Sequence, residues 1–163
     1  MTSSANPNVA ARTARPSLCP CGGATPEPAQ GQRSRSLPAG HGPRFADCCG
    51  RFLDGGMPAP TALELMRSRY SAYVLGDTDY LRATWAPHTC PADLDVDPSA
   101  SDAPRWLGLQ IKRFSAVDDT HAEVEFVARY KVGGRAHRLH ESSRFVRGDD
   151  GRWRYVDGDV SDR

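Results

Sequence analysis

The sequence predicts an α+β protein in which two helices pack on one face of a curved antiparallel sheet, after a small cysteine-bearing segment. Three observations lead to this prediction. Four of the five cysteines lie within residues 18–56. Two helical patterns follow between Pro60 and Trp85. Segments with strand-like alternation, separated by glycine-containing turns, then occupy the chain from Trp106 onward.

Composition and charge restrict the classes of function. The chain has 163 residues and a formal net charge of +1, so it has no general attraction to nucleic acid, and no sequence-specific nucleic-acid partner is expected. Its apolar runs are far shorter than the ~18–20 residues that span a membrane. The N-terminus also lacks the apolar core of a secretory signal, so we expect a cytoplasmic protein without a membrane partner. In that reducing compartment, clustered cysteines bind metal more often than they form disulfides.

Three regions differ in composition. Residues 1–17 are small and polar, which is typical of a disordered terminus. Residues 18–56 carry the cysteine pairs, and between the pairs Ala24–Gly40 has a single large aliphatic residue, Leu37. This insertion cannot bury a core and is predicted to be a loop. Residues 57–163 contain the periodic patterns and all three tryptophans, so they are predicted to form the main domain.

The first helix is predicted over Pro60–Asp77. Thr61 is placed to cap it, Glu64 has the capping-box spacing, and Gly76 is suited to end it. At 100° per residue its apolar face consists of Leu63, Met66, Tyr70, Tyr73 and Val74. A second, shorter helix is predicted over Asp77–Trp85, where the aspartate again supplies a cap.

A loop rich in Asp and Pro, His88–Pro104, leads into the predicted sheet. The four predicted strands are Trp106–Phe114, His121–Val132, Arg135–Arg147 and Arg152–Gly158. The dipeptides Gly133-Gly134 and Asp150-Gly151 predict tight turns before the third and fourth strands. Strands joined by such short turns form an antiparallel meander.

The third predicted strand places a carboxylate beneath the helices. Side chains alternate along a strand, so Leu139, Glu141 and Phe145 share one face. The two apolar residues should face the core, which turns Glu141 inward, where a carboxylate needs a partner. Arg67 and Arg69 lie near the apolar face of the first helix. An ion pair with one of them is the simplest structure, and a ligand-binding or chemical role for Glu141 in a pocket is the alternative.

Five stretches resemble the YchJ family of bacterial proteins. They are CPCGG, RFADCCG, LMRSRYSAYVLGDTDYLRATW, VEFVARY and RLHESSRFVRGDDGRWRYVDG. The resemblance implies a SEC-C-type zinc motif, here residues 18–56, joined to a nuclear transport factor 2-like (cystatin-like) domain, here residues 57–163. The chain departs from the family in two places. The insertion separates the two cysteine pairs more widely than usual, and in ATWAPHTC the histidine, His88, is shifted.

The cysteine pairs are predicted to bind one zinc ion. Zinc prefers four tetrahedral ligands at ~2.3 Å from a thiolate sulfur. The four ligands would be Cys19, Cys21, Cys48 and Cys49. The insertion affects this little, because loop-closure entropy grows slowly with length. His41 is an alternative ligand, although the SEC-C resemblance points to Cys49, and Cys90 is expected to be a free thiol. A site closed by four thiolates is structural and not catalytic.

Two functions from different classes follow. The first is a non-enzymatic adaptor or chaperone-like protein, because the SEC-C resemblance implies contact with a chaperone, a secretion component or the ribosome. Its basic surface would consist of Arg33, Arg35, Arg44 and Arg51. The second is an enzyme or small-ligand binder that uses Glu141 in the conical pocket of the main domain. The other pocket residues would be Arg67, Arg69, Tyr70, Trp85, Trp106 and Tyr130. No nucleophile motif or phosphate loop appears, which favours the first function.

Overall fold

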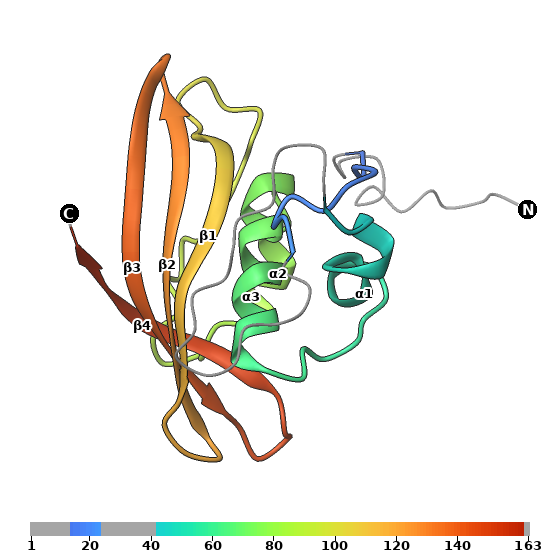
Figure 1. Cartoon of the computed structure of the whole chain (residues 1–163), viewed down its shortest axis with the longest axis vertical. Helices are drawn as coiled ribbons and strands as arrows, with labels where there is room; N and C mark the ends of the chain where they lie inside the picture. The colour runs from blue at the N-terminus through green and yellow to red at the C-terminus, as the bar shows by residue number, and fades with distance from the viewer. Residues whose placement is uncertain (1–13, 24–41, 162–163) are drawn as a thin grey trace, which may run out of the picture.

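The computed structural model describes residues 14–23 and 42–161 and arranges them in three layers (Figure 1). A four-stranded sheet forms the first layer, helices α2 and α3 lie in the middle, and the N-terminal segment with α1 lies on the far side. The helical elements are η1 (Phe45–Asp47), α1 (Gly50–Leu53), α2 (Ala62–Leu75) and α3 (Thr78–Ala83). The α+β architecture that the sequence predicts is therefore confirmed. The insertion Ala24–Gly40, with Arg33 and Arg35, and the alternative ligand His41 lie outside the described residues.

Helix α2 begins and ends at the predicted caps. The backbone N–H of Glu64 donates to Oγ1 of Thr61 at 3.2 Å, which satisfies one of the free donors of the first turn. Gly76 ends the helix with a φ of 74°, the left-handed conformation that favours glycine. A Cβ at Gly76 would also lie 2.5 Å from Cδ of Pro98, so the returning loop requires glycine here as well. The sequence thus defines both ends of this helix.

Helix α2 is buried on two faces, whereas the apolar pattern predicted one. Its predicted face packs against the sheet through residues such as Met66 and Tyr70. On the other side, Ser68 and Ser71 are fully buried. The hydroxyl of Ser68 lies 2.6 Å from that of Tyr80 on α3, and Ser71 contacts the N-terminal segment. Small polar residues with partners on the neighbouring elements let a second layer pack on this face without an apolar stripe.

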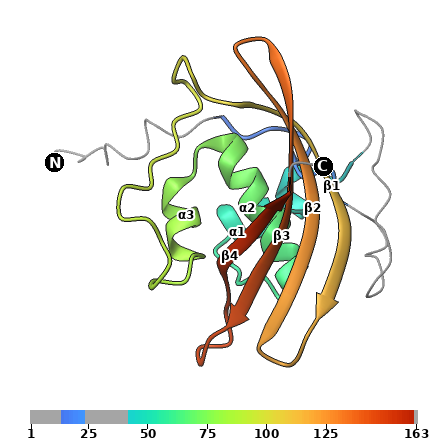
Figure 2. The ribbon, with the colours of Figure 1, turned by 90° about the vertical axis from the view of Figure 1, so that its left-hand side faces the viewer.

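The sheet is an antiparallel meander in the order β1-β2-β3-β4. The strands are β1 (Arg105–Ala116), β2 (His121–Val132), β3 (Arg135–Arg147) and β4 (Trp153–Ser161). Val132 pairs with Arg135 across a two-residue turn in which Gly133 and Gly134 have φ angles of 56° and 80°. The hairpin predicted from these glycines is confirmed. Register shifts interrupt β1 and the β3–β4 pairing, and the sheet curves around the helices (Figure 2).

The segment after α3 is fixed to the last strand. The backbone N–H of Tyr155 donates to the carbonyl of Thr84, and the N–H of Ala86 donates to the carbonyl of Tyr155, both at 2.8 Å. This places Trp85 against Tyr155, with ring centroids 5.0 Å apart and the planes at 82°. The two rings close one end of the space between the helices and the sheet.

The N-terminal segment is packed against the main domain. Residues 14–17, expected to be disordered, are described: the carbonyl of Ser17 accepts from the N–H of Phe45 at 3.0 Å, and Arg15 pairs with Asp54 at 2.8 Å. Phe45 and Phe52 are buried in the same cluster as the core of the sheet and helices. Within the described ranges, no helix has both the length and the apolar character needed to cross a membrane.

Candidate metal centre and sheet pocket

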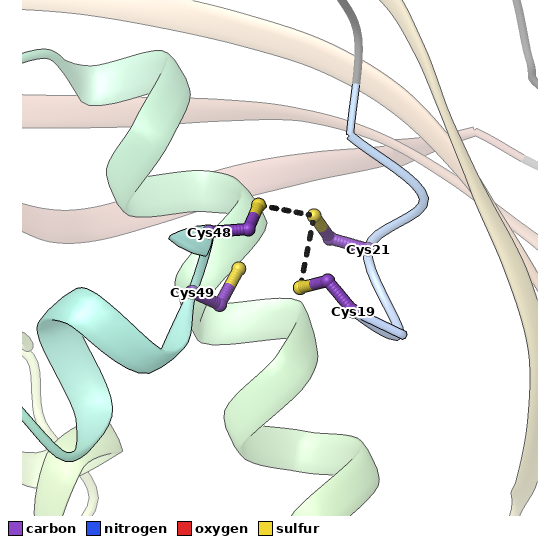
Figure 3. Close-up of side chains that lie close together, drawn as sticks. All are labelled: Cys19, Cys21, Cys48 and Cys49. Atoms are coloured by element: carbon purple, nitrogen blue, oxygen red, sulfur yellow. Dashed lines mark hydrogen bonds between the residues drawn. The ribbon is translucent and has the colours of Figure 1, made fainter. Parts of the chain in front are cut away.

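Four cysteine sulfurs converge in the N-terminal unit, residues 15–23 and 42–53, which we call the knuckle (Figure 3). Cys19 and Cys21 come from the first segment, and Cys48 and Cys49 from the junction of η1 with α1. The four Sγ atoms lie within 4.8 Å of one another. The distance is 3.4 Å between Cys19 and Cys21 and 3.6 Å between Cys21 and Cys48. The structure thus brings together the four residues that the sequence predicts as ligands.

Backbone pairing between the two halves of the knuckle positions these thiols. Leu18 and Arg44 form an isolated antiparallel bridge, and the N–H of Cys19 donates to the carbonyl of Pro43 at 2.9 Å. The chain must then turn sharply after the two adjacent cysteines. A Cβ at Gly50 would lie 2.6 Å from the carbonyl oxygen of Phe45, so only glycine allows α1 to start this close to η1. This turn directs both adjacent cysteines toward the first segment.

The geometry of the four sulfurs fits a tetrahedral metal ion. Thiolates at ~2.3 Å from one ion would be about 3.8 Å apart, close to the observed separations. A disulfide would need about 2.05 Å, so all four cysteines are free. The N–H of Gly23 donates to Sγ of Cys21 at 3.3 Å, a contact that stabilises negative charge on sulfur. Cys19, Cys21 and Cys49 are buried, and four sulfur donors leave no open coordination position.

The crowded thiols also differ in acidity. The side-chain contact between Cys19 and Cys21 lowers the pKa of Cys19 and raises the pKa of Cys21. Contacts with Cys19, Cys21 and Cys48 raise the pKa of Cys49. A positive ion bound among these thiols would favour the release of their protons.

The cysteine cluster is in contact with the central helix. Sγ of Cys19 lies 3.6 Å from Oγ of Ser71 on α2, and Arg51 approaches Glu64 at 3.7 Å between charged atoms. The predicted boundary between residues 18–56 and 57–163 is therefore not a gap in the packing. Whether the main domain folds without the knuckle stays a prediction. Cys90 lies apart from the four thiols, in the loop after α3.

A second feature is a pocket of about 260 Å³ between α2 and the sheet. Five of the predicted pocket residues line it: Arg69, Tyr70, Trp85, Trp106 and Glu141. The remaining lining residues are Met66, Tyr73, Phe126, Ala128, Leu139, Ser143 and Tyr155. Two predicted residues are not part of this wall. Tyr130 packs against Trp106 and stacks on His137, and Arg67 is buried elsewhere on α2.

Arg69 brings a buried positive charge to the pocket. It is 3% exposed, and its Nη1 donates to the carbonyl of Leu81 at 2.9 Å and to Oγ1 of Thr84 at 2.7 Å. Its Cζ lies 4.9 Å and 4.8 Å from the ring centroids of Trp85 and Tyr155. Burial lowers the pKa of Arg69 from its ordinary value. The aromatic rings partly replace water around the guanidinium.

Glu141 lies in the pocket as strand alternation predicts, but the predicted ion pair with Arg67 or Arg69 is wrong. Oε1 of Glu141 accepts from the hydroxyl of Tyr155 at 2.8 Å and from that of Ser143 at 3.1 Å. Across the described residues, no ion pair includes this carboxylate. Tyr155 meets the need for a partner, and burial together with the Glu141 charge raises the pKa of Tyr155.

Several pocket residues were missed in the sequence. Tyr73 belongs to the predicted apolar face of the first helix, so its place could have been found. The place of Tyr155 could not have been found, because it depends on a shift in the pairing of β3 with β4 between Arg144 and Phe145. Gly158 was also missed: a Cβ there would collide with Oε1 of Glu141, so this glycine makes room for the carboxylate.

A comparison with known proteins identifies relatives over most of the chain. A family model described as "YchJ, middle NTF2-like domain" matches residues 61–158. A UPF0225 protein from Ralstonia nicotianae is 57% identical over 145 residues, which cover 85% of this chain and 98% of that protein. A UPF0225 protein from Cupriavidus pinatubonensis is 59% identical over 128 residues, which cover 76% of this chain and 87% of that protein.

Two solved structures are also similar. The solution structure of a SEC-C motif containing protein from Rhodopseudomonas palustris has a TM-score of 0.65 and 33% identity, covering 76% of this chain and 96% of that one. The crystal structure of a SEC-C motif containing protein from Psychrobacter arcticus has a TM-score of 0.64 and 29% identity, covering 88% of this chain and 82% of that one. Each of these matches covers a larger share of this chain than residues 61–158 do.

Proposed function

This chain belongs to the YchJ family, also designated UPF0225, and on that premise we propose that it binds a small ligand in the pocket between α2 and the sheet. One observation carries the proposal: the pocket holds a guanidinium and a carboxylate that are not paired with each other. A buried charge without an opposite charge beside it is costly, and here Arg69 is buried and Glu141 is half-buried. A mostly apolar pocket with a few convergent polar groups is the usual form of a binding site.

The metal has a structural role in this proposal. Four thiolates favour zinc among the divalent ions available to proteins, because zinc accepts a tetrahedral sulfur environment without redox chemistry. The ion would hold the knuckle against α2, the helix that forms one wall of the pocket. Thiols act as metal ligands in a reducing compartment, so the proposal places the protein in the cytoplasm.

Heteronuclear NMR of the full-length, zinc-loaded chain tests ligand binding. Trp85 and Trp106 line the pocket and Trp153 does not, so the three indole N–H signals provide a probe with an internal control. Small molecules from a fragment collection that includes neutral, singly charged and zwitterionic compounds should shift the first two signals. Ala128→Leu should fill the pocket and abolish these shifts. The exposed Ala136→Leu should not.

The outcome is decisive in both directions. If no fragment shifts the Trp85 or Trp106 signal, the small-ligand function is wrong. It is also wrong if fragments bind equally well to wild type and to the folded Ala128→Leu variant.

A second candidate function is protein binding by the knuckle, with a chaperone, a secretion component or the ribosome as partner. The observation that favours it is a shallow groove beside Leu18, which is 41% exposed. The knuckle is less basic than its sequence suggests. Arg44 pairs with Asp47 at 2.7 Å, and Arg51 approaches Glu64.

Cosedimentation with purified bacterial ribosomes tests this candidate. Leu18→Asp should prevent cosedimentation. Val117→Asp, at an exposed position between β1 and β2, is the control and should not prevent it.

A further inference from the structure

Tyr155 holds the two charges of the pocket apart. Cζ of Arg69 lies 4.8 Å from the centroid of the Tyr155 ring, and the hydroxyl of the same ring donates to Oε1 of Glu141 at 2.8 Å. The guanidinium therefore contacts the ring while the carboxylate is held at the hydroxyl. Among the described residues, neither charge is ion-paired, although Arg69 is buried and Glu141 is half-buried, where an opposite charge would be favoured.

The carboxylate end has capacity for a further donor. Glu141 accepts two hydrogen bonds, both on Oε1, from Tyr155 and Ser143. A carboxylate offers about four acceptor sites. Both of its present donors are neutral hydroxyls, so its charge is not neutralised. An ammonium group would supply the charge and donors that Oε2 lacks, in a pocket whose aromatic walls also favour cations.

The guanidinium end has capacity for a further acceptor. Nη1 of Arg69 donates to Leu81 and Thr84, and the guanidinium also interacts with the hydroxyl of Tyr73. A guanidinium carries more N–H donors than these contacts use, so donors remain for an acceptor in the pocket. The positive charge of Arg69 opposes the rise in the pKa of Tyr73 that burial causes, so this hydroxyl is also nearby.

Trp85, which lines the pocket beside Arg69, carries an unsatisfied donor. Its Nε1–H is buried and has no hydrogen-bond partner among the described residues, and its ring centroid lies 4.9 Å from Cζ of Arg69. A buried donor without an acceptor destabilises the protein by about 1–3 kcal/mol, so a ligand oxygen at this position would be favoured. A carboxylate is the group that can accept from an indole N–H and a guanidinium together.

The middle of the pocket is apolar. Met66, Phe126 and Leu139 line it together with the aromatic rings. A neighbouring hollow shares Tyr73 and Trp106 with the pocket and is lined by Asp95, Asp97 and Asp102. These exposed carboxylates repel a ligand whose only charge is negative. A ligand that carries a positive group as well as a negative one is therefore favoured over one with a negative group alone.

Building on the proposed small-ligand function, we propose that the pocket selects a small zwitterion with an apolar body, such as an amino acid. Its ammonium group would bind Glu141, and its carboxylate would bind Arg69 and the indole N–H of Trp85. Its apolar body would contact the side chains between the two ends. Tyr155 then serves as a spacer that prevents the two protein charges from neutralising each other.

Three matched compounds separate the two charges. L-phenylalanine is the zwitterion, phenethylamine lacks its carboxylate and 3-phenylpropanoate lacks its ammonium group. Binding to the zinc-loaded full chain is measured by titration calorimetry at pH 7, and the remaining protein amino acids are tested with their corresponding amines and acids. In the best-binding set the zwitterion should bind at least ~10-fold more tightly than either singly charged compound, the factor expected when one good charged contact is lost.

Variants test the assignment of each end. Glu141→Gln keeps an acceptor for Tyr155 but removes the negative charge. It should lower the affinity for the zwitterion and for the amine by ~10-fold or more and leave the affinity for the acid unchanged. Trp85→Phe removes the indole N–H, so it should lower the affinity for the zwitterion and for the acid and leave the affinity for the amine unchanged. Glu123→Gln on the exposed face of β2 and Trp153→Phe outside the pocket are the matched controls. Spectra of each variant establish that it is folded.

The outcomes distinguish this inference from the function on which it rests. If an amine or an acid binds as tightly as its zwitterion, the pocket binds ligands but the zwitterion assignment is wrong. The same conclusion follows if the Glu141→Gln and Trp85→Phe variants retain wild-type affinity. If no compound of any set binds and no fragment shifts the pocket indoles, both the inference and the small-ligand function are wrong.

Discussion

Sγ of Cys19 lies 3.6 Å from Oγ of Ser71, so the cysteine cluster contacts the middle of the helix that also forms a wall of the pocket. Tyr70, the preceding residue of α2, faces the sheet and lines that pocket. The cysteine cluster and the pocket thus lie on opposite sides of one helix. Any change in the knuckle that displaces α2 should therefore be measurable at the pocket.

Purified protein should contain one zinc ion per chain. The four thiols provide the complete ligand set, so Cys48→Ser should remove most of the metal. Cys90→Ser should retain it, because Cys90 lies apart from the site. Mass spectrometry of the metal content checks both variants. Wild-type zinc content in Cys48→Ser would show that this thiol is not a ligand.

Deletion of Ala24–Gly40 should leave the metal in place. The ends of the described segments on either side are close together, because a Cβ at Gly42 would lie 3.2 Å from the carbonyl oxygen of Gly22. A short linker can therefore replace the insertion, and the shorter loop should even reduce the entropy lost on folding. Zinc content and thermal midpoint are compared with those of wild type. A loss of metal would mean that the insertion contributes to the site.

Metal chelation should lower the thermal midpoint without abolishing the sheet. The apolar residues of 57–163 are expected to form a core alone, but removing the knuckle exposes the buried face of α2 around Ser68 and Ser71. The far-UV circular dichroism of the strands should persist, and amide exchange in α2 should increase. Loss of the strand signal on chelation would show that the knuckle is needed for the whole fold.

Glu141→Ala should destabilise the protein moderately. An ion pair with arginine would have predicted a loss of about 3–5 kcal/mol. The observed partners are two hydroxyls, and leaving them without an acceptor should cost about 1–2 kcal/mol. Glu141→Gln retains an acceptor, so its free energy of unfolding should be closer to that of wild type. Urea denaturation of both variants gives the comparison, and a loss as large as that of a broken ion pair would contradict the structure.

Gly158→Ala should move the carboxylate with little effect on stability. The added Cβ collides with Oε1 of Glu141, the end of a flexible side chain that can rotate away. Its hydrogen bond to Tyr155 would then break, for a cost of about 1 kcal/mol, while ligand affinity falls to that of Glu141→Gln. Gly148→Ala on the hairpin before β4 is the control for a glycine distant from Glu141. If Gly158→Ala binds the ligand with wild-type affinity, Glu141 does not contribute to ligand binding.

Local patterns in the sequence predicted most of the elements and one wall of the pocket. Thr61 and Gly76 define α2 because caps act over a few residues, and Gly133-Gly134 fixes the register of β2 and β3. Alternation along a strand is also a local pattern, and it correctly predicted that Glu141 points inward. The sequence also predicted that the four cysteines come together, although from a resemblance as well as from spacing.

The unpredicted features depend on contacts between distant segments. The partner of Glu141 is Tyr155, whose inward position follows from a register shift in β4. Likewise, the backbone bonds between Tyr155 and the segment of Trp85 join residues about seventy positions apart, and no local pattern encodes them. The burial of Ser68 and Ser71 had no apolar signal at all, because their hydroxyls are satisfied by partners on other elements.

The close approach of Gly22 and Gly42 has a practical consequence. Because the backbone is already bridged at Leu18 and Arg44, the chain between Gly23 and Gly42 starts and finishes at one point on the surface of the knuckle. Such a point is a permissive position for internal fusion. A peptide epitope or a fluorescent protein inserted there would leave both chain ends unmodified, so the protein could be imaged or captured without a terminal tag.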